Sequence, residues 1–308
     1  MIESPPTVDD ASATTRMSRA GRGIGETMLF AVKLSRPGFW LTAAWFYLFP
    51  LGYSHLWATP RFWFGLFFVM FPFGLFIYGW NDFMDAKADR VNPRKGGFLF
   101  GPKATDAERR EIPWIIGLIH LPLLGYLGLA VSSRFFWWYL LLAGATAIYN
   151  LPRWGFKNWP VLDVLNQTGY LLVFTFSSWI NGAPTLSVGV MIFGVMFAMH
   201  SHLLGQIMDL EPDREAGRKT TAVWLGRLAT KYLMAGLMAV ECLLVFEIGD
   251  GVIASFLAMG ALWFLVDAGL LFGSRPYPGF LMRLFLIGWN AAAVVSAPWV
   301  WVHGSFAR

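Results

Sequence analysis

Long apolar stretches alternate with short polar connections along most of this chain. Each stretch holds about 20 mostly apolar residues, enough to cross roughly 30 Å of bilayer hydrocarbon as a helix. The stretches lie at residues 39–57, 62–81, 113–132, 135–150, 163–182, 187–208, 228–247, 251–272 and 282–303. Because lipid cannot satisfy exposed backbone groups, stretches of this length are helices rather than barrel strands. The pattern predicts an all-α integral membrane protein, a bundle of nine transmembrane helices.

The composition agrees with this prediction. The chain is 56% hydrophobic and only 14% charged, whereas soluble domains average about 25% charged residues. Residues 1–26 are polar, carry acids and lack the continuous apolar region of a cleaved signal. We therefore expect a disordered cytoplasmic tail at 1–26 and a single membrane domain at 27–308. The lone Cys242 excludes an internal disulfide and a thiolate metal cluster.

The basic residues predict the orientation of the chain. With the N-terminus in the cytoplasm, 19 of the 24 Lys and Arg residues fall in cytoplasmic segments, as the positive-inside rule requires. The C-terminus then lies on the opposite side. The pI is about 9.4, but the basic residues sit in loops beside the spans. Anionic lipid headgroups or an anionic substrate explain them better than nucleic acid does.

Polar side chains mark the end of the second stretch. Asn81, Asp85 and Asp89 are spaced i, i+4 and i+8, which places them on one face of a continuing helix. Like charges stacked in this way repel, so a cation is expected between them. Carboxylates and an amide oxygen are hard ligands that suit Mg²⁺. Asp82 points about 100° away, as a flanking ligand or a solvated side chain.

A similar pattern follows the sixth stretch. His202, Gln206, Asp209 and Asp213 are spaced i, i+4, i+7 and i+11, again on one helical face. Both acidic segments lie on the same predicted side of the membrane, so they can converge. Each is followed by basic residues, namely Arg90, Arg94 and Lys95 in one case and Arg214, Arg218 and Lys219 in the other. Either cluster alone equally fits a solvated helix end, but together they favour a metal-bridged diphosphate site.

Such a site favours one kind of chemistry. Mg²⁺ on a diphosphate neutralises the leaving group and promotes cleavage of the C–O bond to an allylic carbon. The resulting carbocation must be kept from water, and aromatic faces stabilise its charge. Tyr78, one turn before Asn81, is the aromatic residue expected nearest the cation. His202 and Gln206 are either catalytic or simply polar wall residues, and Glu241 and Asp267 read as buried, paired structural groups or neutral acids.

Two motifs resemble those of a known family. The segment "NDFMDAKAD" looks like the NDxxDxxxD signature of the UbiA superfamily of intramembrane prenyltransferases, and "DLEPD" resembles its DxxxD motif. The resemblance implies a nine-helix bundle around a lipid-open cavity, capped by cytoplasmic loops. It also implies one Mg²⁺ set at Asn81, Asp85 and Asp89, a second at Asp209 and Asp213, and phosphate contacts from Lys219 with Arg94 or Lys95.

A third segment, "IYNLPRWGFKNWPVLDVLNQTGY", is similar to the family's YSxPPxRxK connection. Tyr149 and Lys157 keep their places, whereas Asn150 and Arg153 depart from the pattern. This departure bears on the acceptor chemistry more than on diphosphate binding. Lys157 reads equally as a diphosphate ligand or as an ordinary loop lysine. Asn166 is placed to face the cavity; Asp163 shares this interpretation but fits a helix N-cap at least as well.

These considerations assign the candidate residues as a set. Asp85, Asp209, Tyr78 and Tyr149 are candidate catalytic residues; Arg94, Lys95, Lys157, Arg218, Lys219, Asn166, Gln206 and His202 are candidates for substrate binding; Asn81, Asp82, Asp85, Asp89, Asp209 and Asp213 are candidate metal ligands. The segments "LSRPGFW", "NPRKGG" and "DLEPDREAG" look most like the family's lycopene-elongase-like branch. The expected activity is Mg²⁺-dependent transfer of a prenyl cation from an isoprenoid diphosphate to a lipophilic acceptor. A membrane terpene cyclase is the alternative, and an ion- or lipid-handling transporter is a remote one.

The stacked acidic spacing yields a prediction. Asp85→Asn and Asp209→Asn should each nearly abolish turnover of an allylic diphosphate, because each removes a charged ligand from the expected metal site. Both variants should still fold, since one oxygen and one amide nitrogen replace the carboxylate isosterically. Diphosphate release by each purified variant measures the effect, and a variant with normal activity would remove the metal-site assignment.

Overall fold

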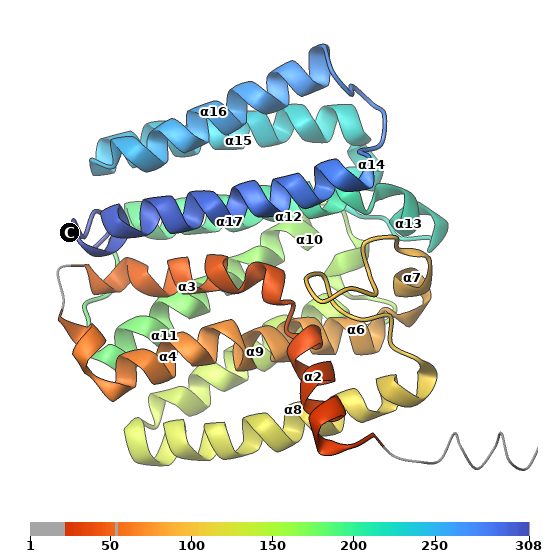
Figure 1. Cartoon of the computed structure of the whole chain (residues 1–308). Coiled ribbons are helices and arrows are strands. Elements are labelled where there is room, and N and C mark those ends of the chain that lie inside the picture. Colours follow the sequence, from red (N-terminus) through yellow and green to blue (C-terminus); the bar gives the residue numbers. More distant parts are fainter. Residues whose placement is uncertain (1–21, 53–54, 308) are drawn as a thin grey trace, which may run out of the picture.

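The computed structural model describes residues 22–52 and 55–307, and within them the regular elements are helices. Figure 1 shows the long helices side by side with their axes roughly parallel. They are α3 (Trp40–Leu48), α4 (Pro60–Met70), α8 (Asp106–Gly125), α9 (Arg134–Asn150), α11 (Leu171–Asn181), α12 (Val188–Met208), α15 (Arg227–Ile248), α16 (Gly251–Gly269) and α17 (Gly279–Trp301). The predicted all-α bundle is confirmed, and most of the expected tail, residues 1–21, lies outside the described residues.

Six stretches of the described chain are long and apolar enough to cross a membrane, where the sequence predicts nine. They are Pro60–Met84, Asp106–Val131, Val188–Met208, Arg227–Ile248, Gly251–Gly269 and Gly279–Trp301. The other three expected spans contain shorter helices. The first stops being α-helical at Leu48 and tightens into a 3₁₀ turn at Phe49–Leu51, where Pro50 has no N–H to donate. α9 has 17 residues, and α11 has 11 and follows the 3₁₀ helix η7 (Asn166–Tyr170).

α2 (Ile24–Leu34) is short and packs against η4 (Leu75–Gly79) and α8. It begins three residues earlier than the expected domain boundary at residue 27, since the Gly23 N–H donates to the Glu26 side chain at 3.1 Å. Its buried face is formed by Phe30, Ala31 and Leu34, which cluster with isoleucines of α8. This apolar burial holds the helix against its neighbours.

Aromatic packing joins the helices around the centre of the bundle. Phe68 of α4 stacks on Phe176 of α11, with ring centroids 4.4 Å apart. Gly65 lets α4 approach Tyr47 of α3, because a Cβ there would lie 2.3 Å from the tyrosine oxygen. The Tyr47 hydroxyl donates to the Phe62 carbonyl at 2.9 Å. Buried tyrosine therefore keeps a hydrogen-bond partner, as its desolvation requires.

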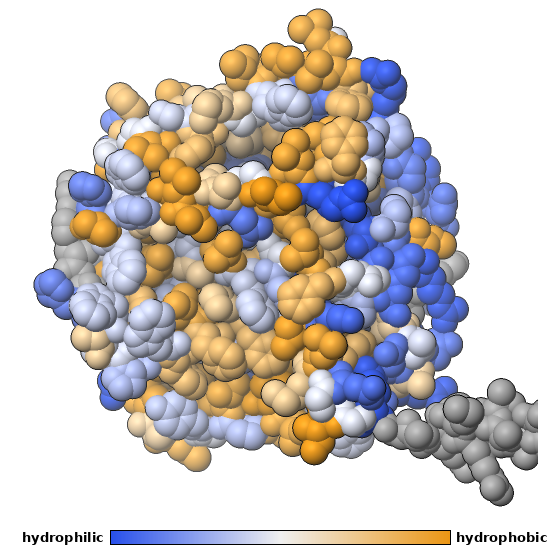
Figure 2. Space-filling model, viewed as in Figure 1, coloured by the Kyte–Doolittle hydropathy of each residue, from blue (hydrophilic) through white to orange (hydrophobic). Residues whose placement is uncertain are grey.

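One end of the bundle is polar. Figure 2 shows hydrophilic residues gathered along one edge, and Figure 1 places α7 (Ala86–Val91), α13 (Leu210–Glu215) and their connections at that edge. Much of the face between the two ends is hydrophobic. This distribution suits a protein whose sides face lipid and whose end loops face water.

α15 and α16 form a hairpin that Figure 1 places beside α12 and α17. At the polar end, Lys231 of α15 pairs with Asp267 of α16 at 2.7 Å, and both side chains are fully buried. Tyr277, on the connection to α17, also donates to Asp267. The expected structural role of Asp267 agrees with this paired arrangement.

We expect Asp267→Asn to destabilise the protein. Removing one partner of a buried ion pair leaves an uncompensated charge, here on Lys231, and costs about 3–5 kcal/mol. The melting temperature, followed by tryptophan fluorescence in detergent, should fall by roughly 6 °C or more. Glu247→Gln, at an exposed carboxylate of α15, is the control and should melt like the unmodified protein. Equal melting of both variants would contradict the structural role.

Candidate active site

A cavity of about 330 Å³ opens at the polar end of the bundle, between α3, α9, α12, α17 and the segment that precedes α7. This volume falls at the lower end of the range typical of small-molecule sites. Its polar part is lined by most of the predicted site residues, and its deeper part by apolar and aromatic side chains, among them Phe46, Val69, Phe73 and Leu142. One cavity therefore combines a charged end, which we call the charged head, with an apolar interior.

The first acidic segment is broken at Asp85, where a continuing helix was expected. α6 (Trp80–Met84) ends there, and Asp85 itself has φ −101° and ψ 16° before α7 begins. The Asp85 N–H still donates to the Asn81 carbonyl at 2.9 Å, and the Asp89 N–H to the Asp85 carbonyl at 3.0 Å. The i, i+4 stacking thus survives the break, and Asn81, Asp85 and Asp89 all line the cavity.

The second acidic segment repeats this construction. Asp209 ends α12 with φ −98° and ψ 7°, and α13 begins at the next residue. The Asp213 N–H donates to the Asp209 carbonyl at 2.8 Å. α13 contacts α7, and both Asp209 and Asp213 line the same cavity as Asp85. The structure therefore brings the two predicted acidic faces together.

The arginine that follows each motif pairs with the aspartate of the other motif. Arg94, after the first motif, donates through Nε to Asp209 Oδ1 at 2.8 Å and also pairs through Nη2. Arg218, after the second motif, lies 2.7 Å from Asp85 and 3.0 Å from Asp213. Asn92 adds a hydrogen bond to Asp209 at 2.9 Å. We call the Arg94–Asp209 and Arg218–Asp85 contacts the crossed ion pairs, because each of them joins one motif to the other.

Lys157 completes the surroundings of Asp85. Its ammonium lies 2.5 Å from Asp85 Oδ1 and 3.2 Å from the Asn150 amide oxygen. Both charged side chains are buried, unlike those of an ordinary loop lysine. Burial raises the pKa of Asp85, but Arg218 and Lys157 outweigh it and hold that pKa below its usual value. Arg153, the other departure from the family pattern, is exposed and outside the cavity lining.

Two predicted residues lie elsewhere. Asp82, a candidate metal ligand, is buried behind the cavity wall, 2.8 Å from Arg36 and 2.5 Å from Lys95. It is not solvated, and it shares the Lys95 ammonium with Asp89, which lies 3.2 Å from that nitrogen. Lys219, a candidate phosphate ligand, is exposed and outside the lining. Arg218, one residue earlier, takes the inward position.

The carboxylates of Asp89 and Asp213 are buried beside other acids, and the nearby basic residues only partly neutralise them. Burial, and then the neighbouring Asp82, raise the pKa of Asp89 to about 7. Burial, followed by Asp209 and Asp85 against the opposing charge of Arg218, raises the pKa of Asp213 to about 7 as well. In the described residues no three His, Cys, Asp or Glu side chains gather closely enough to hold an ion. The oxygens and their unmet charge nonetheless fit a hard divalent cation.

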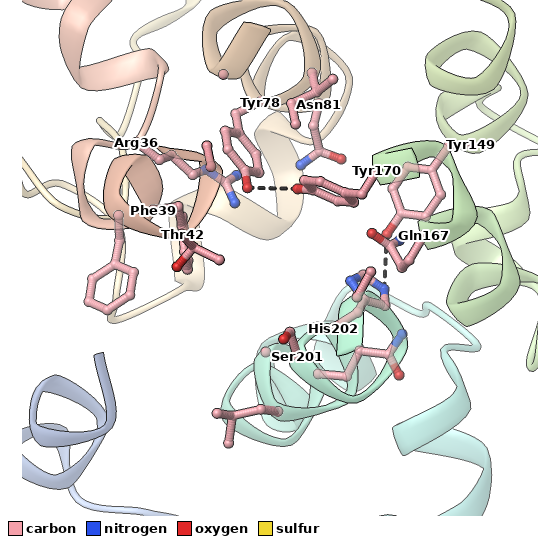
Figure 3. A pocket seen from close by; sticks show the side chains of 18 of the residues that line it. Arg36, Phe39, Thr42, Tyr78, Asn81, Tyr149, Gln167, Tyr170, Ser201 and His202 are labelled. Atoms are coloured by element: carbon pink, nitrogen blue, oxygen red, sulfur yellow. Dashed lines mark hydrogen bonds between the residues drawn. The ribbon is translucent and has the colours of Figure 1, made fainter. Parts of the chain in front are cut away.

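Tyrosines line the cavity beside the charged head. Figure 3 shows Tyr78 and Tyr170 turned toward each other, with their hydroxyl oxygens 2.7 Å apart, and Tyr149 beside His202. The Arg36 guanidinium lies over the Tyr78 ring, 4.6 Å from its centroid. The Tyr149 oxygen is 3.4 Å from His202 Nε2. The predicted aromatic residues thus line the same cavity as the carboxylates, and Arg36 already covers one face of the Tyr78 ring.

Gln206 is held by a buried clamp around Asp163. The Gln206 amide donates to Asp163 at 2.6 Å and accepts from the Ala222 N–H at 3.0 Å. Asp163 also accepts from the Thr221 hydroxyl at 2.5 Å and from its N–H at 2.7 Å. Asp163 therefore fixes the segment after α13 rather than facing the cavity, whereas Asn166 lies on the cavity lining.

Sequence reasoning assigned no role in the site to Arg36 or Tyr170. Arg36 has φ 53°, in the left-handed region that non-glycine residues rarely adopt. The sequence does carry one signal for an unusual backbone here: Arg36 precedes Pro37, and a proline disfavours the α region in the residue before it. The Arg36 side chain links the Asp82 carboxylate to the Tyr78 ring. Tyr170 gave no comparable signal, because it lies inside an apolar stretch.

Glu241, the other acid within a span, faces His200. The His200 Nδ1 and Glu241 Oε1 atoms are 2.7 Å apart, and both residues are fully buried. Phe197 and Trp289, which line the cavity, pack on the His200 ring at centroid distances of 5.0 and 5.4 Å. This pair lies behind the cavity wall, in keeping with the predicted paired, structural role.

No family model matches the chain. Several curated proteins are similar to it, among them three that are named lycopene elongase/hydratase. The protein from Haloarcula japonica is 31% identical over 264 residues, which cover 80% of this chain and 82% of that protein. The Halobacterium salinarum protein is 32% identical over 202 residues, 63% of this chain and 70% of its own. The Corynebacterium glutamicum protein is 25% identical over 283 residues, 87% and 96% respectively.

Solved structures share the fold. A UbiA homologue from Archaeoglobus fulgidus, bound to DMAPP and Mg²⁺, superposes with a TM-score of 0.68 at 21% identity and covers 88% of this chain and 97% of that chain. The same homologue bound to GPP and Mg²⁺ gives a TM-score of 0.65. The bundle described above is therefore the arrangement found in that homologue.

Lys157→Met should weaken binding of a labelled allylic diphosphate by roughly 10- to 100-fold. A hydrogen bond to a charged group contributes about 1.5–3 kcal/mol, and each 1.4 kcal/mol is about a tenfold change in affinity. Arg153→Met is the matched control, because Arg153 is a basic residue of the same connection but is exposed. Equal binding by both variants would return Lys157 to the role of an ordinary loop lysine.

Proposed function

This chain belongs to the UbiA superfamily, on its lycopene elongase/hydratase branch, and we propose that it is a prenyltransferase of the membrane. In this proposal it ionises an allylic isoprenoid diphosphate and transfers the prenyl group to a lipophilic acceptor. The observation that carries the proposal is one cavity with a crossed network of acids and bases at its polar end and an apolar, aromatic interior. The two parts match the two halves of such a substrate.

The crossed ion pairs already contain both kinds of group that the diphosphate needs. Asn81, Asp85 and Asp89 would hold one Mg²⁺ set, and Asp209 and Asp213 the other. The Archaeoglobus fulgidus homologue, whose structures contain DMAPP or GPP with Mg²⁺, supports the choice of metal and of an isoprenoid diphosphate as substrate. When bound, Mg²⁺ would neutralise charge on the leaving diphosphate. The basic residues now paired with the carboxylates, Arg94, Lys95, Lys157 and Arg218, would turn to the phosphate oxygens.

The remaining chemistry falls to the walls of the cavity. Cleavage of the C–O bond sends its electron pair out with the diphosphate and leaves an allylic cation, which the rings of Tyr78 and Tyr149 on the cavity lining would stabilise. The π electrons of an acceptor double bond then form the new C–C bond. The tertiary cation left on the acceptor loses a proton, or takes the oxygen of water and then loses a proton. The names of the relatives, which join elongase and hydratase, favour the second course and an acyclic polyene as acceptor.

The distribution of basic residues supports an orientation for this enzyme. We place the N-terminus and the loops of both motifs in the cytoplasm and the C-terminus on the opposite side. The diphosphate head would then bind at the cytoplasmic edge, while the acceptor approaches through the membrane. Membrane lipid would surround the apolar sides of the bundle.

The decisive experiment combines diphosphate release with product mass. The purified protein in detergent is given Mg²⁺ and a series of allylic diphosphates, with and without lycopene. We expect release that depends on lycopene, a product heavier by the prenyl group with or without one water, and loss of activity with EDTA. Release without any acceptor, with a cyclised hydrocarbon or alcohol as product, would instead identify a membrane terpene cyclase.

A further inference from the structure

A second cavity, of about 380 Å³, lies away from the charged head between α12, α15, α16 and α17. We call it the side chamber. Its walls are mainly aliphatic and aromatic, with Met238, Phe256, Leu257, Trp263, Phe264 and Leu281 among them. No Lys, Arg, His, Asp or Glu is part of its lining. A ligand for this space has no charge and little need for hydrogen bonds.

The few polar atoms on the chamber wall do not form a polar site. The Ser296 hydroxyl donates to the Ala293 carbonyl of its own helix at 3.3 Å. Thr42 Oγ1, Trp45 Nε1 and Trp263 Nε1 are buried and have no partner among the described residues. They come from α3 and α16, two different helices, and they neither bond to each other nor to a third group. The favourable contribution available to a ligand here is apolar burial and contact with ring faces.

The side chamber and the active-site cavity share a wall. Thr42, Phe197, Leu204, Phe285 and Trp289 line both spaces. A long molecule lying in the chamber therefore needs to pass only this layer of side chains to reach the reaction cavity. The wall is mainly aromatic, so its faces can rest on a flat, unsaturated chain.

We propose that the side chamber holds the body of the acceptor, an acyclic polyene hydrocarbon, while the end of that polyene reaches the active-site cavity through the shared wall. This inference rests on the proposed function. In the proposed function the donor is held by its diphosphate near Asp85, Asp209 and their basic neighbours at the polar end, and its prenyl chain occupies the apolar interior of the first cavity. The acceptor needs a separate, uncharged space that leads to the same reacting carbon, and the chamber meets both conditions.

Gly288 of α17 offers a way to fill the chamber. It is on the chamber lining, and a Cβ added there would meet no heavy atom within 4 Å. Gly236 of α15 has equally open surroundings but is not part of either cavity. Both glycines lie in the middle of long helices, where a leucine favours the helix more than glycine does. The two substitutions are therefore matched in their backbone effect and differ in whether they fill the chamber.

The test compares Gly288→Leu with Gly236→Leu in the full-length protein. We expect Gly288→Leu to bind a labelled allylic diphosphate with Mg²⁺ as the unmodified protein does, and to transfer the prenyl group to lycopene at least tenfold less efficiently, through a higher KM for lycopene. Gly236→Leu should match the unmodified protein in both assays. Gly288→Ala, which adds a single methyl group, should lie between them and tests the chamber should the leucine variant not fold.

Three results would overturn the proposal. The first is transfer by Gly288→Leu within twofold of the control. The second is a tenfold loss of diphosphate affinity in Gly288→Leu, which would assign the chamber to the donor's chain. The third is normal lycopene binding, measured by quenching of tryptophan fluorescence, together with loss of a copurified phospholipid, which would make the chamber a lipid site.

The same measurements separate this proposal from the proposed function. If the unmodified protein releases diphosphate but transfers nothing to lycopene, prenyl transfer to a polyene fails as the function. Lycopene quenching of the unmodified protein and of Gly288→Leu still tests the chamber in that case. Weaker quenching in the variant alone supports the chamber as a polyene site, and equal quenching overturns it.

Discussion

The organisation of this protein depends on the crossed ion pairs at the polar end of the bundle. Arg94 and Arg218 each reach from the segment after one acidic motif to an aspartate of the other. Burying charge is costly, and a buried pair is at best weak evidence of added stability. The pairs instead hold two distant parts of the sequence against each other, so that α7 and α13 meet over the cavity. Each acidic motif therefore has one of its aspartates paired with the arginine that follows the other motif.

The rest of the bundle supplies a dry surrounding for that charged end. Stacked rings such as Phe68 on Phe176 join α4 to α11, and the Asp163 clamp fixes the chain after α13 without placing a charge in the cavity. Because the effective dielectric is low in such a space, the contacts of the charged end are stronger than they would be in water. The apolar interior therefore strengthens the ion pairs of the charged head, because it keeps water away from them.

The helices and the spacing of the acidic residues were predictable from the sequence. Which side chains face the cavity, and which distant residues they pair with, were not always predictable. The apolar stretches gave the helical class and the six strongest spans, and the i, i+4 spacing placed Asn81, Asp85 and Asp89 on the cavity. Sequence alone did not distinguish Arg218 from Lys219, since neighbouring residues on a turn differ only in which faces inward. It also missed the burial of Asp82, whose partner Arg36 lies 46 positions away. The shortened α3 and the interrupted α11 depend on local 3₁₀ turns that an average over 20 residues conceals.

Asp85 and Asp209 share a further property, which follows from the way each ends a membrane helix. The carboxyl end of a helix carries partial negative charge, so it repels anions and attracts cations. Two such ends, those of α6 and α12, meet at this cavity. The carboxyl ends of α6 and α12 therefore favour cations, although the short helices α7 and α13 begin directly after them. In the proposed function, positive charge from Mg²⁺ and the basic residues would offset the partial negative charge of these two helix ends when a diphosphate binds.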